Sequence, residues 1–189
     1  MANVPFPYNY EPGFDIWKKS YLYDVDGDGR ILFSDLTTVG AYQDNHLTGF
    51  IQYGKTAFGF DDNGEISDGI SYPVIRNFYF CESQKEAGIM LLNEALKALS
   101  DTSERIYAFF HHFGMSCYAR HGKLFEGFSH IHDLMRQNGF SIEHENVFYA
   151  SFLNDKKSTK VSLKWHDVTS GGQKYCDFIQ KGLTRSYFK

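Results

Sequence analysis

Histidines and other groups that can exchange protons gather in one stretch of the chain, residues 111–133, which holds five of the eight histidines. The chemistry-bearing side chains there are His111, His112, Cys117, Tyr118, His121, Glu126, His130, His132 and Asp133. None follows an established metal-ligand spacing such as His-Glu-x-x-His or Cys-x-x-Cys, so a metal site is not favoured. We expect a binding site in which one or two of these groups exchange protons near neutral pH. A Cys–His nucleophile pair, and histidines that only hydrogen-bond within loops, stay open as alternatives.

A second candidate is the acidic segment from Asp24 to Asp35, which has the sequence Asp-Val-Asp-Gly-Asp-Gly-Arg-Ile-Leu-Phe-Ser-Asp. Acidic residues at loop positions 1, 3, 5 and 12, with glycine at position 6, match the pattern of a calcium loop. Position 12 is Asp35 where such loops usually carry a bidentate glutamate, and the motif occurs once although calcium loops normally pair. Calcium binding and a solvated acidic turn therefore remain alternative interpretations.

The third candidate is the point where a predicted strand, residues 70–80, leads directly into a predicted helix, residues 83–99. The helix is indicated by apolar residues at helical spacing, namely Ile89, Leu92, Leu96 and Leu99. Ser83 and Glu86 have the spacing of a capping box, which predicts where this helix starts. The free N–H groups of a helix N-terminus, together with Lys85, could attract phosphate oxygens, unless Glu86 already occupies those donors.

Further elements must position these groups. We expect a helical turn at 14–21 and a hairpin turn at 61–64, and the predicted strands are 30–36, 47–60, 105–110 and 140–153, with a second helix at 129–138. Strands that alternate with helices in this way indicate a mixed α/β layer architecture. Residues 155–160 form a polar linker, and residues 161–179 are typical of a hairpin. We therefore expect one domain over residues 1–154 and a separate C-terminal segment over residues 155–189.

Composition excludes several classes of protein. The formal net charge is −4 and the pI is about 6.0 without a Lys/Arg cluster, so nucleic acid is not an expected partner. The chain has neither an apolar run that could cross a membrane nor a secretory signal at its start. The three cysteines, Cys81, Cys117 and Cys176, favour reduced thiols in a cytoplasmic protein. Aromatic residues make up 17% of the chain, which favours a sheet-rich core.

Taken together, residues 47–153 resemble the GNAT superfamily of acyl-CoA N-acyltransferases. The matching segments are Leu47-Thr-Gly-Phe-Ile51, Val74–Phe80 running into Glu82–Leu92, Arg105–Phe110, and Leu134-Met-Arg-Gln-Asn-Gly-Phe140. The resemblance implies an α/β (α+β) fold with a twisted, mixed, mostly antiparallel sheet that has helices on both faces. The segment Gly182–Phe188 also looks like a closing strand of this family, so the chain could be one lobe of a tandem protein or form a homo-oligomer.

In that family acetyl-CoA is the acyl donor. The resemblance implies that the backbone of Phe78, Tyr79 and Phe80 pairs with the pantetheine arm. It further implies a phosphate-binding loop that corresponds to Ser83, Gln84, Lys85, Glu86, Ala87 and Gly88. Ser83 stands where the family carries a basic or amide residue, and Glu86 stands where it carries glycine.

The implied reaction is direct attack of a primary amine, from a small molecule or a peptide, on the acetyl thioester. We expect Glu126, His111 or His112 as the base and Tyr118 as the acid that protonates the leaving thiolate, because Met135 stands where the family often has a tyrosine. The unusual phosphate loop favours a second hypothesis, in which the chain is a non-catalytic binding or assembly lobe of the same fold.

Overall fold

The computed structural model describes residues 12–100, 105–118 and 124–145. The chain divides into two compact units, residues 1–143 and 144–189, and every helix and strand given below belongs to the first. The predicted hairpin at 161–179 and the boundary at residue 154 lie outside the described residues, so they remain predictions.

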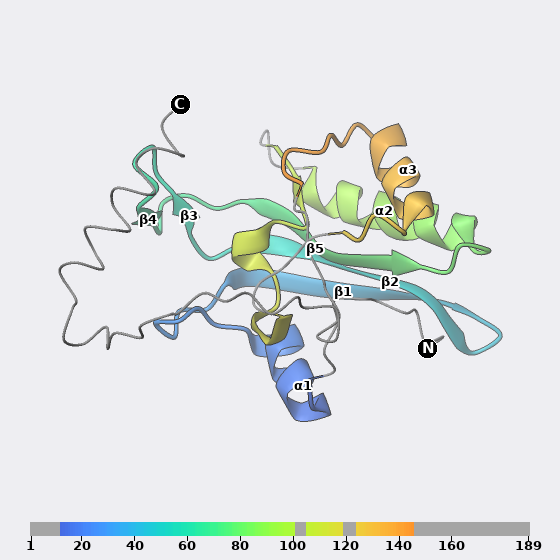
Figure 1. The fold of residues 1–189 in the computed structure, drawn as a ribbon, viewed down its shortest axis with the longest axis horizontal. Helices are drawn as coiled ribbons and strands as arrows, with labels where there is room; N and C mark the ends of the chain where they lie inside the picture. Colours follow the sequence, from blue (N-terminus) through green and yellow to red (C-terminus); the bar gives the residue numbers. More distant parts are fainter. Residues whose placement is uncertain (1–11, 101–104, 119–123, 146–189) are drawn as a thin grey trace, which may run out of the picture. The chain divides into compact units, whose positions relative to one another are not determined.

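A four-stranded sheet in the order β1-β2-β5-β6 forms the centre of the first unit (Figure 1). Its strands are β1 (Phe33–Gln43), β2 (His46–Thr56), β5 (Pro73–Phe80) and β6 (Tyr107–Ala108). The β1–β2 and β2–β5 pairs are antiparallel, and the β5–β6 pair is parallel. The expected mixed, mostly antiparallel sheet is therefore confirmed.

The first strand pair is longer than the sequence pattern indicated. Strand β1 runs on to Gln43, seven residues beyond the predicted end at residue 36, and then turns back through Asp44 and Asn45. Both turn residues have positive φ, 49° and 64°, as a two-residue hairpin whose twist matches the flanking strands requires. Asp and Asn tolerate this conformation better than most residues, so a local signal for the hairpin was present.

The strand predicted at 47–60 is interrupted. Strand β2 ends at Thr56, and the two-residue strands β3 (Gly59–Phe60) and β4 (Ile66–Ser67) form a separate small hairpin. The turn predicted at 61–64 is confirmed, because the Asp61 carboxylate accepts hydrogen bonds from the backbone N–H groups of Asn63 and Glu65.

Helices cover both faces of the sheet, as expected. Figure 1 shows α2 (Lys85–Leu99) and α3 (Ser129–Gln137) on one face and α1 (Phe14–Tyr23) on the other. The largest core lies beneath α2 and α3 and contains Ile51, Tyr53, Ile75, Phe78, Phe80, Leu91, Leu92, Leu99, Ile131, Leu134 and Met135. Each large apolar side chain removed from water contributes about 1.5–3 kcal/mol, so this core is the main reason that α2 and α3 pack here.

Helix α2 packs very close to β5 because a glycine faces the sheet. A Cβ atom on Gly88 would lie 2.6 Å from the Phe80 ring, and one on Gly49 of β2 would lie 2.9 Å from the Phe80 Cβ. The Phe80 side chain is thus held between two residues that have none. Gly88, which the sequence resemblance assigned to phosphate binding, is required here for packing.

Two further expectations about the elements are wrong. The Ser83–Glu86 capping box does not form, because the N-cap residue of α2 is Gln84, without a side-chain cap. The strand predicted at 105–110 shortens to β6, since Phe109 adopts a positive φ and a 3₁₀ turn begins at His111. Most of the strand predicted at 140–153 lies outside the described residues, and its described part, residues 140–145, is not in a strand. The predicted end of α3 is confirmed by Gly139, whose φ is 86°.

Candidate functional site

Strand β5 contains an irregularity in its pairing with β2. In its pairing with β2, Gln52 faces Asn77 and Tyr53 faces Ile75, so Arg76 is an extra residue, a β-bulge. Because of the bulge, Ile75 and Phe78 both face the core under α2. Arg76 and Asn77 make their hydrogen bonds on the opposite side, toward α1.

Strands β5 and β6 separate immediately beyond this bulge. Their pairing covers only Val74 with Tyr107 and Ile75 with Ala108, and it ends with a bond from the Phe109 N–H to the Ile75 carbonyl. Among the described residues no strand pairs with this edge of β5 from residue 76 to residue 80. The Phe80 carbonyl there accepts a hydrogen bond of 2.9 Å from His130 Nε2.

Phe109 turns the chain away from β5 and is strained. Its φ is 56°, a conformation that costs a residue with a Cβ atom roughly 1–2 kcal/mol relative to glycine. A bulky aromatic residue rarely adopts it, and such strain clusters at functional sites. The strained residue and the bulge lie side by side where the two strands diverge, so this junction is the candidate functional site.

The strain at Phe109 predicts that glycine stabilises the protein more than alanine at this position, the reverse of the usual order. Glycine at position 109 should give a protein about 1 kcal/mol more stable than alanine, because both lose the ring and only alanine retains the strain. The neighbouring Phe110, with φ −69°, provides the control, and there alanine should be the more stable variant. Urea unfolding of the four variants measures both differences. If the alanine variant is at least as stable as the glycine variant at both positions, the inference that Phe109 is strained is wrong.

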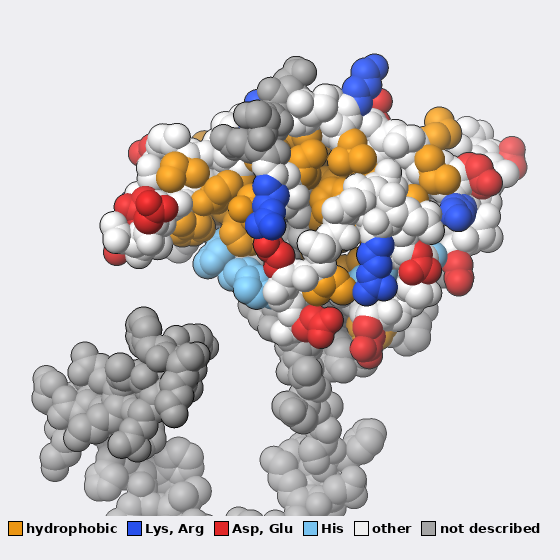
Figure 2. Space-filling view, turned by 90° about the horizontal axis from the view of Figure 1, so that it is seen from above, with side chains coloured by type: hydrophobic (Ala, Val, Ile, Leu, Met, Phe, Trp, Pro, Cys, Tyr) orange, Lys and Arg blue, Asp and Glu red, His pale blue; other side chains and the backbone are white. Residues whose placement is uncertain are grey.

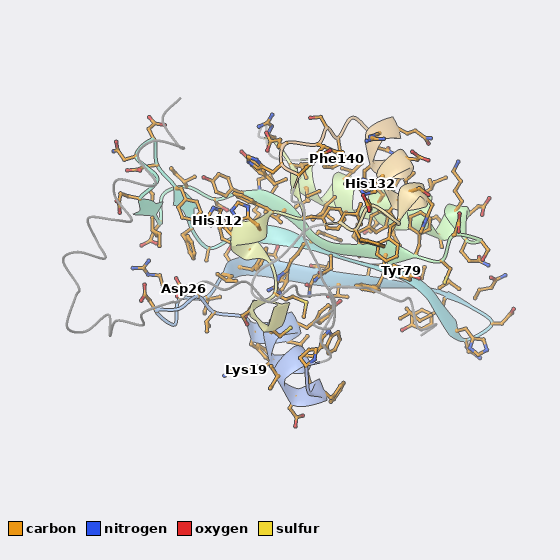
Figure 3. All side chains as sticks on the ribbon, in the orientation of Figure 1. Lys19, Asp26, Tyr79, His112, His132 and Phe140 are labelled. Carbon is orange, nitrogen blue, oxygen red and sulfur yellow. The ribbon has the colours of Figure 1, made fainter. Side chains whose placement is uncertain are left out.

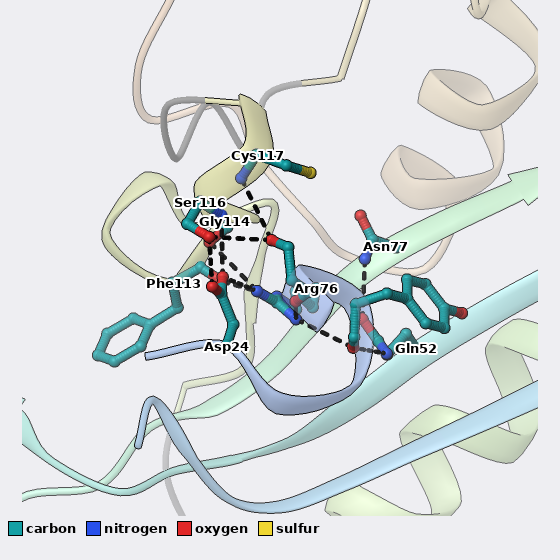
Figure 4. Close-up of polar contacts among 10 residues, drawn as sticks. Asp24, Gln52, Arg76, Asn77, Phe113, Gly114, Ser116 and Cys117 are labelled. Carbon is teal, nitrogen blue, oxygen red and sulfur yellow. Dashed lines mark hydrogen bonds and ion pairs between the residues drawn. The ribbon is translucent and has the colours of Figure 1, made fainter. Parts of the chain in front are cut away.

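A buried ion pair joins the bulge to two distant segments (Figure 4). Arg76, 2% exposed, contacts the Asp24 carboxylate at 2.6 Å. Its other acceptors are the backbone carbonyls of Phe113 at 2.9 Å, Ser20 at 3.1 Å, Gly114 at 3.3 Å and Tyr21 at 3.4 Å. Five acceptors match the five N–H donors of a guanidinium, so its desolvation is compensated.

Asp24 completes this network on the carboxylate side. It accepts hydrogen bonds from the backbone N–H and the hydroxyl of Ser116, while Ser20 in α1 bonds to the Ser116 hydroxyl and accepts the Cys117 N–H. The network therefore holds the segment 113–117 against the end of α1 and the bulge of β5. The candidates His111, His112 and Tyr118 adjoin this segment, so the network also positions them.

The same geometry corrects the calcium interpretation of the acidic segment. Asp24, which would be the first ligand, faces Arg76, and the Asp26 carboxylate accepts the backbone N–H groups of Asp28 and Arg30 within the turn that precedes β1 (Figure 3). Asp35, the twelfth position, lies in β1 opposite Lys55. In the part of the chain that the structure describes, no three His, Cys, Asp or Glu side chains come together as a metal site. The segment is an acidic turn closed by its own backbone.

The predicted proton-transfer residues lie in different surroundings. His111 and His112 lie in a 3₁₀ turn, His111–Phe113, with their ring centroids 3.9 Å apart, and His112 packs on Phe60 at 4.8 Å (Figure 3). Partial burial lowers the pKa of His112 below 6.5, so its neutral form prevails at neutral pH. Glu126 is exposed in the turn before α3.

The Glu126 turn contacts other parts of the fold than the two histidines do. Phe125 and Phe128, which flank Glu126, contact each other, and Phe128 contacts Tyr79 and His130. Tyr118, the predicted acid, ends the 3₁₀ turn at Ser116–Tyr118, and its side chain is not among those described.

The predicted coenzyme-binding residues lie at the end of β5, in the turn after it and at the start of α2. Phe78 and Phe80 are buried, and Tyr79 is half-buried with ring contacts to Phe50 and Phe128. Burial also raises the pKa of the Tyr79 hydroxyl. Ser83 and Gln84 form the turn that follows, and Lys85, Glu86 and Ala87 make up the first turn of α2, whose N-cap residue makes no side-chain bond.

On the side of the molecule that carries α2 and α3, hydrophobic side chains lie between scattered charged groups, and histidines lie at one edge (Figure 2). Two of the exposed hydrophobic residues are Ile89 and Met90 of α2, which are 37% and 71% exposed. This face therefore carries charges of both signs, and neither sign gathers into one large patch.

Sequence analysis missed Arg76, Asn77 and Gln52. A signal was present, because Arg76 and Asn77 interrupt the otherwise apolar run Val74–Phe80. A charged residue in a buried strand is almost always paired. Its partner, Asp24, is 52 positions away and lies in the segment for which sequence analysis left calcium binding and a solvated turn as alternatives.

Comparison with known proteins gives a likeness in structure. No protein-family model and no curated protein sequence matches the chain. Among solved structures it is similar to the apo crystal structure of aminoglycoside antibiotic 6′-N-acetyltransferase AAC(6′)-IG from Acinetobacter haemolyticus. The TM-score is 0.38 and the identity 15%, over 64% of this chain and 72% of that one. None of the helices in the described ranges is long and apolar enough to cross a membrane.

Proposed function

We propose that this protein is an N-acyltransferase that moves an acetyl group from acetyl-CoA to a primary amine of a small molecule or peptide. The observation that carries the proposal is the junction where β5 parts from β6 beside a bulge and leads, through a four-residue turn, to the start of α2. A strand edge that no described strand covers and the start of a helix thus follow each other along the chain.

The open edge of β5 suits the pantetheine arm of the coenzyme. A strand edge presents unpaired N–H and C=O groups, and the amide groups of pantetheine can bond to them as a neighbouring strand would. Phe78 and Phe80 anchor this edge in the core through their side chains. The backbone N–H groups at the start of α2, with Lys85 in the first turn, suit the pyrophosphate.

The chemistry requires one proton acceptor and one proton donor. The amine nitrogen attacks the thioester carbonyl, a C–N bond forms, the C–S bond breaks, and the amine loses a proton to a base while the thiolate gains one. His112 is the base that we favour, since its lowered pKa keeps the imidazole neutral, and His111 and Glu126 remain candidates. Tyr118 remains the proposed acid.

Calorimetric titration of the full chain with acetyl-CoA tests this proposal. We expect saturable one-to-one binding, followed by release of free CoA thiol when a panel of primary amines is added. Absence of binding at millimolar coenzyme would overturn the proposal.

Glu86 is expected to weaken coenzyme binding, because an acidic side chain in the first turn of α2 repels phosphate. Glu86→Gln should tighten acetyl-CoA binding about two- to fivefold, which corresponds to roughly 0.3–1 kcal/mol. Glu86→Gly should also tighten acetyl-CoA binding, because it removes the acidic side chain and lets the phosphate approach the backbone closely. Glu94→Gln, an exposed position farther along α2, is the control and should change nothing. Equal affinities for all variants in calorimetry would exclude the start of α2 as the phosphate site.

A non-catalytic binding or assembly lobe is the second candidate, and two observations favour it. His130 already bonds to the Phe80 carbonyl on the open edge, and Glu86 lies where phosphate would bind. Acetyl-CoA binding without any release of CoA thiol, across the amine panel, would support this candidate over the transferase.

A further inference from the structure

The orientation of the Asn77 side chain is determined by its neighbours. Gln52, 1% exposed, directs Nε2 to the backbone carbonyl of Tyr21 at 3.0 Å and to the Thr38 hydroxyl at 3.2 Å. A carbonyl oxygen can only accept, so the Gln52 amide cannot be reversed without placing two acceptors together. Gln52 Oε1 must therefore face Asn77, whose Nδ2 donates to it at 2.8 Å.

It follows that the Asn77 Oδ1 atom points away from the sheet partner. Figure 4 shows this oxygen directed away from Gln52, and no described residue donates a hydrogen bond to it. The side chain is half-buried and follows Arg76 directly, beside the point where β5 and β6 diverge. The hydrogen bonds from Gln52 to Tyr21 and Thr38, and from Asn77 to Gln52, thus fix the orientation of Asn77 Oδ1. This oxygen is a hydrogen-bond acceptor at the junction to which no described residue donates.

Aromatic rings lie next to this acceptor on the same side of the sheet. Tyr79 follows Asn77 by two positions on β5, and Phe50 precedes Gln52 by two positions on β2. The rings of Phe50 and Tyr79 are 6.4 Å apart, and the Tyr21 ring meets Phe50 at 6.5 Å. Burial raises the pKa values of both Tyr21 and Tyr79, so both rings stay neutral. Ring faces and an acceptor oxygen are the groups that bind an organic ammonium ion.

We propose that Asn77 Oδ1, with the rings of Tyr79 and Phe50, binds the protonated primary amine of the acceptor. The identification of this ligand as the acceptor rests on the proposed transferase function. The ammonium donates an N–H to Oδ1, the rings contact its positive charge and the adjoining methylene groups, and the base removes one proton before the nitrogen attacks. The ring faces, which attract the positive charge, then favour a protonated amine over an alcohol.

The test is an NMR titration of the ¹⁵N-labelled full chain with n-butylammonium, followed through the side-chain amide signals of Gln52 and the backbone amide signal of Tyr79, which remain when Asn77 is replaced. We expect saturable shifts, and binding about tenfold weaker for n-butyltrimethylammonium, which has the charge but no N–H donor. Asn77→Leu should bind n-butylammonium about tenfold more weakly, because it lacks the acceptor oxygen.

Asn93→Leu, the same substitution at an exposed position on α2, is the matched control and should leave the affinity unchanged. Equal affinity of wild type and Asn77→Leu for n-butylammonium would overturn the inference, as would equal binding of the two cations. Titration with acetyl-CoA separates this result from the parent proposal. If the protein does not bind acetyl-CoA but still binds the amine in an Asn77-dependent manner, the proposed transferase function is wrong and the amine site is retained.

Discussion

Replacing Arg76 by alanine is expected to lower the free energy of unfolding by about 3–5 kcal/mol, because it leaves the buried Asp24 carboxylate without its cation. The guanidinium also bonds to four backbone carbonyls from α1 and from residues 113–114, and these would lose their donor. Urea unfolding followed by circular dichroism measures the loss. The segment 113–117 should become more mobile at the same time, since the ion pair holds it, and amide hydrogen exchange would detect this.

The chain contains its own control for this prediction. Arg105 and Glu143 form an ion pair with the same 2.6 Å distance between nitrogen and oxygen, but with side chains that are 64% and 45% exposed. Arg105→Ala should cost less than about 1 kcal/mol, because water screens an exposed pair. A second test is the double variant Asp24→Leu, Arg76→Met, which should recover the part of the loss that comes from the unpaired Asp24 charge, since an apolar pair leaves no buried charge. Equal costs for Arg76→Ala and Arg105→Ala would contradict the structural role of the buried pair.

The second large effect is expected at His112. If this residue is the base, His112→Gln should lower kcat/KM for the amine by about 10²–10⁴-fold. The pH dependence of kcat/KM should report the ionisation of His112, because the imidazole accepts a proton only while it is neutral. Burial lowers its pKa below 6.5, so activity of the wild type should fall on the acid side at a pH below 6.5. This acid limb should be absent from the residual activity of His112→Gln.

Stability gives a readout of His112 that does not depend on catalysis. Its pKa is lower in the folded chain than in the unfolded chain, so protons bind the unfolded state more tightly. Stability should therefore fall as the pH drops from the unfolded pKa, about 6.5, through the lowered folded value. His112→Gln should reduce that fall, and His46→Gln, an exposed residue at the start of β2, is the control. An unchanged acid limb of activity in His112→Gln would leave His111 and Glu126 as the candidates for the base.

The amino-acid sequence by itself determined the elements whose signals are local. The apolar spacing of Ile89, Leu92, Leu96 and Leu99 predicted α2, Gly139 marked the end of α3, and the Asp61–Gly64 segment predicted its turn. Each depends on residues within a few positions of one another, since helices and turns are formed by neighbours along the chain. The order of these elements also indicated a mixed α/β architecture, whereas the mostly antiparallel sheet was implied by the family resemblance.

Only the tertiary structure decided how the candidate site is built. The bulge at Arg76 exists relative to β2, the partner of Arg76 is Asp24, and the free oxygen of Asn77 is oriented through Gln52 and Tyr21. The acidic segment shows the difference most clearly, because its spacing fits a cation loop, whereas the fold turns Asp24 inward to a buried arginine. Strand register and buried pairing join residues that are dozens of positions apart, and they depend on which groups the packed core removes from water.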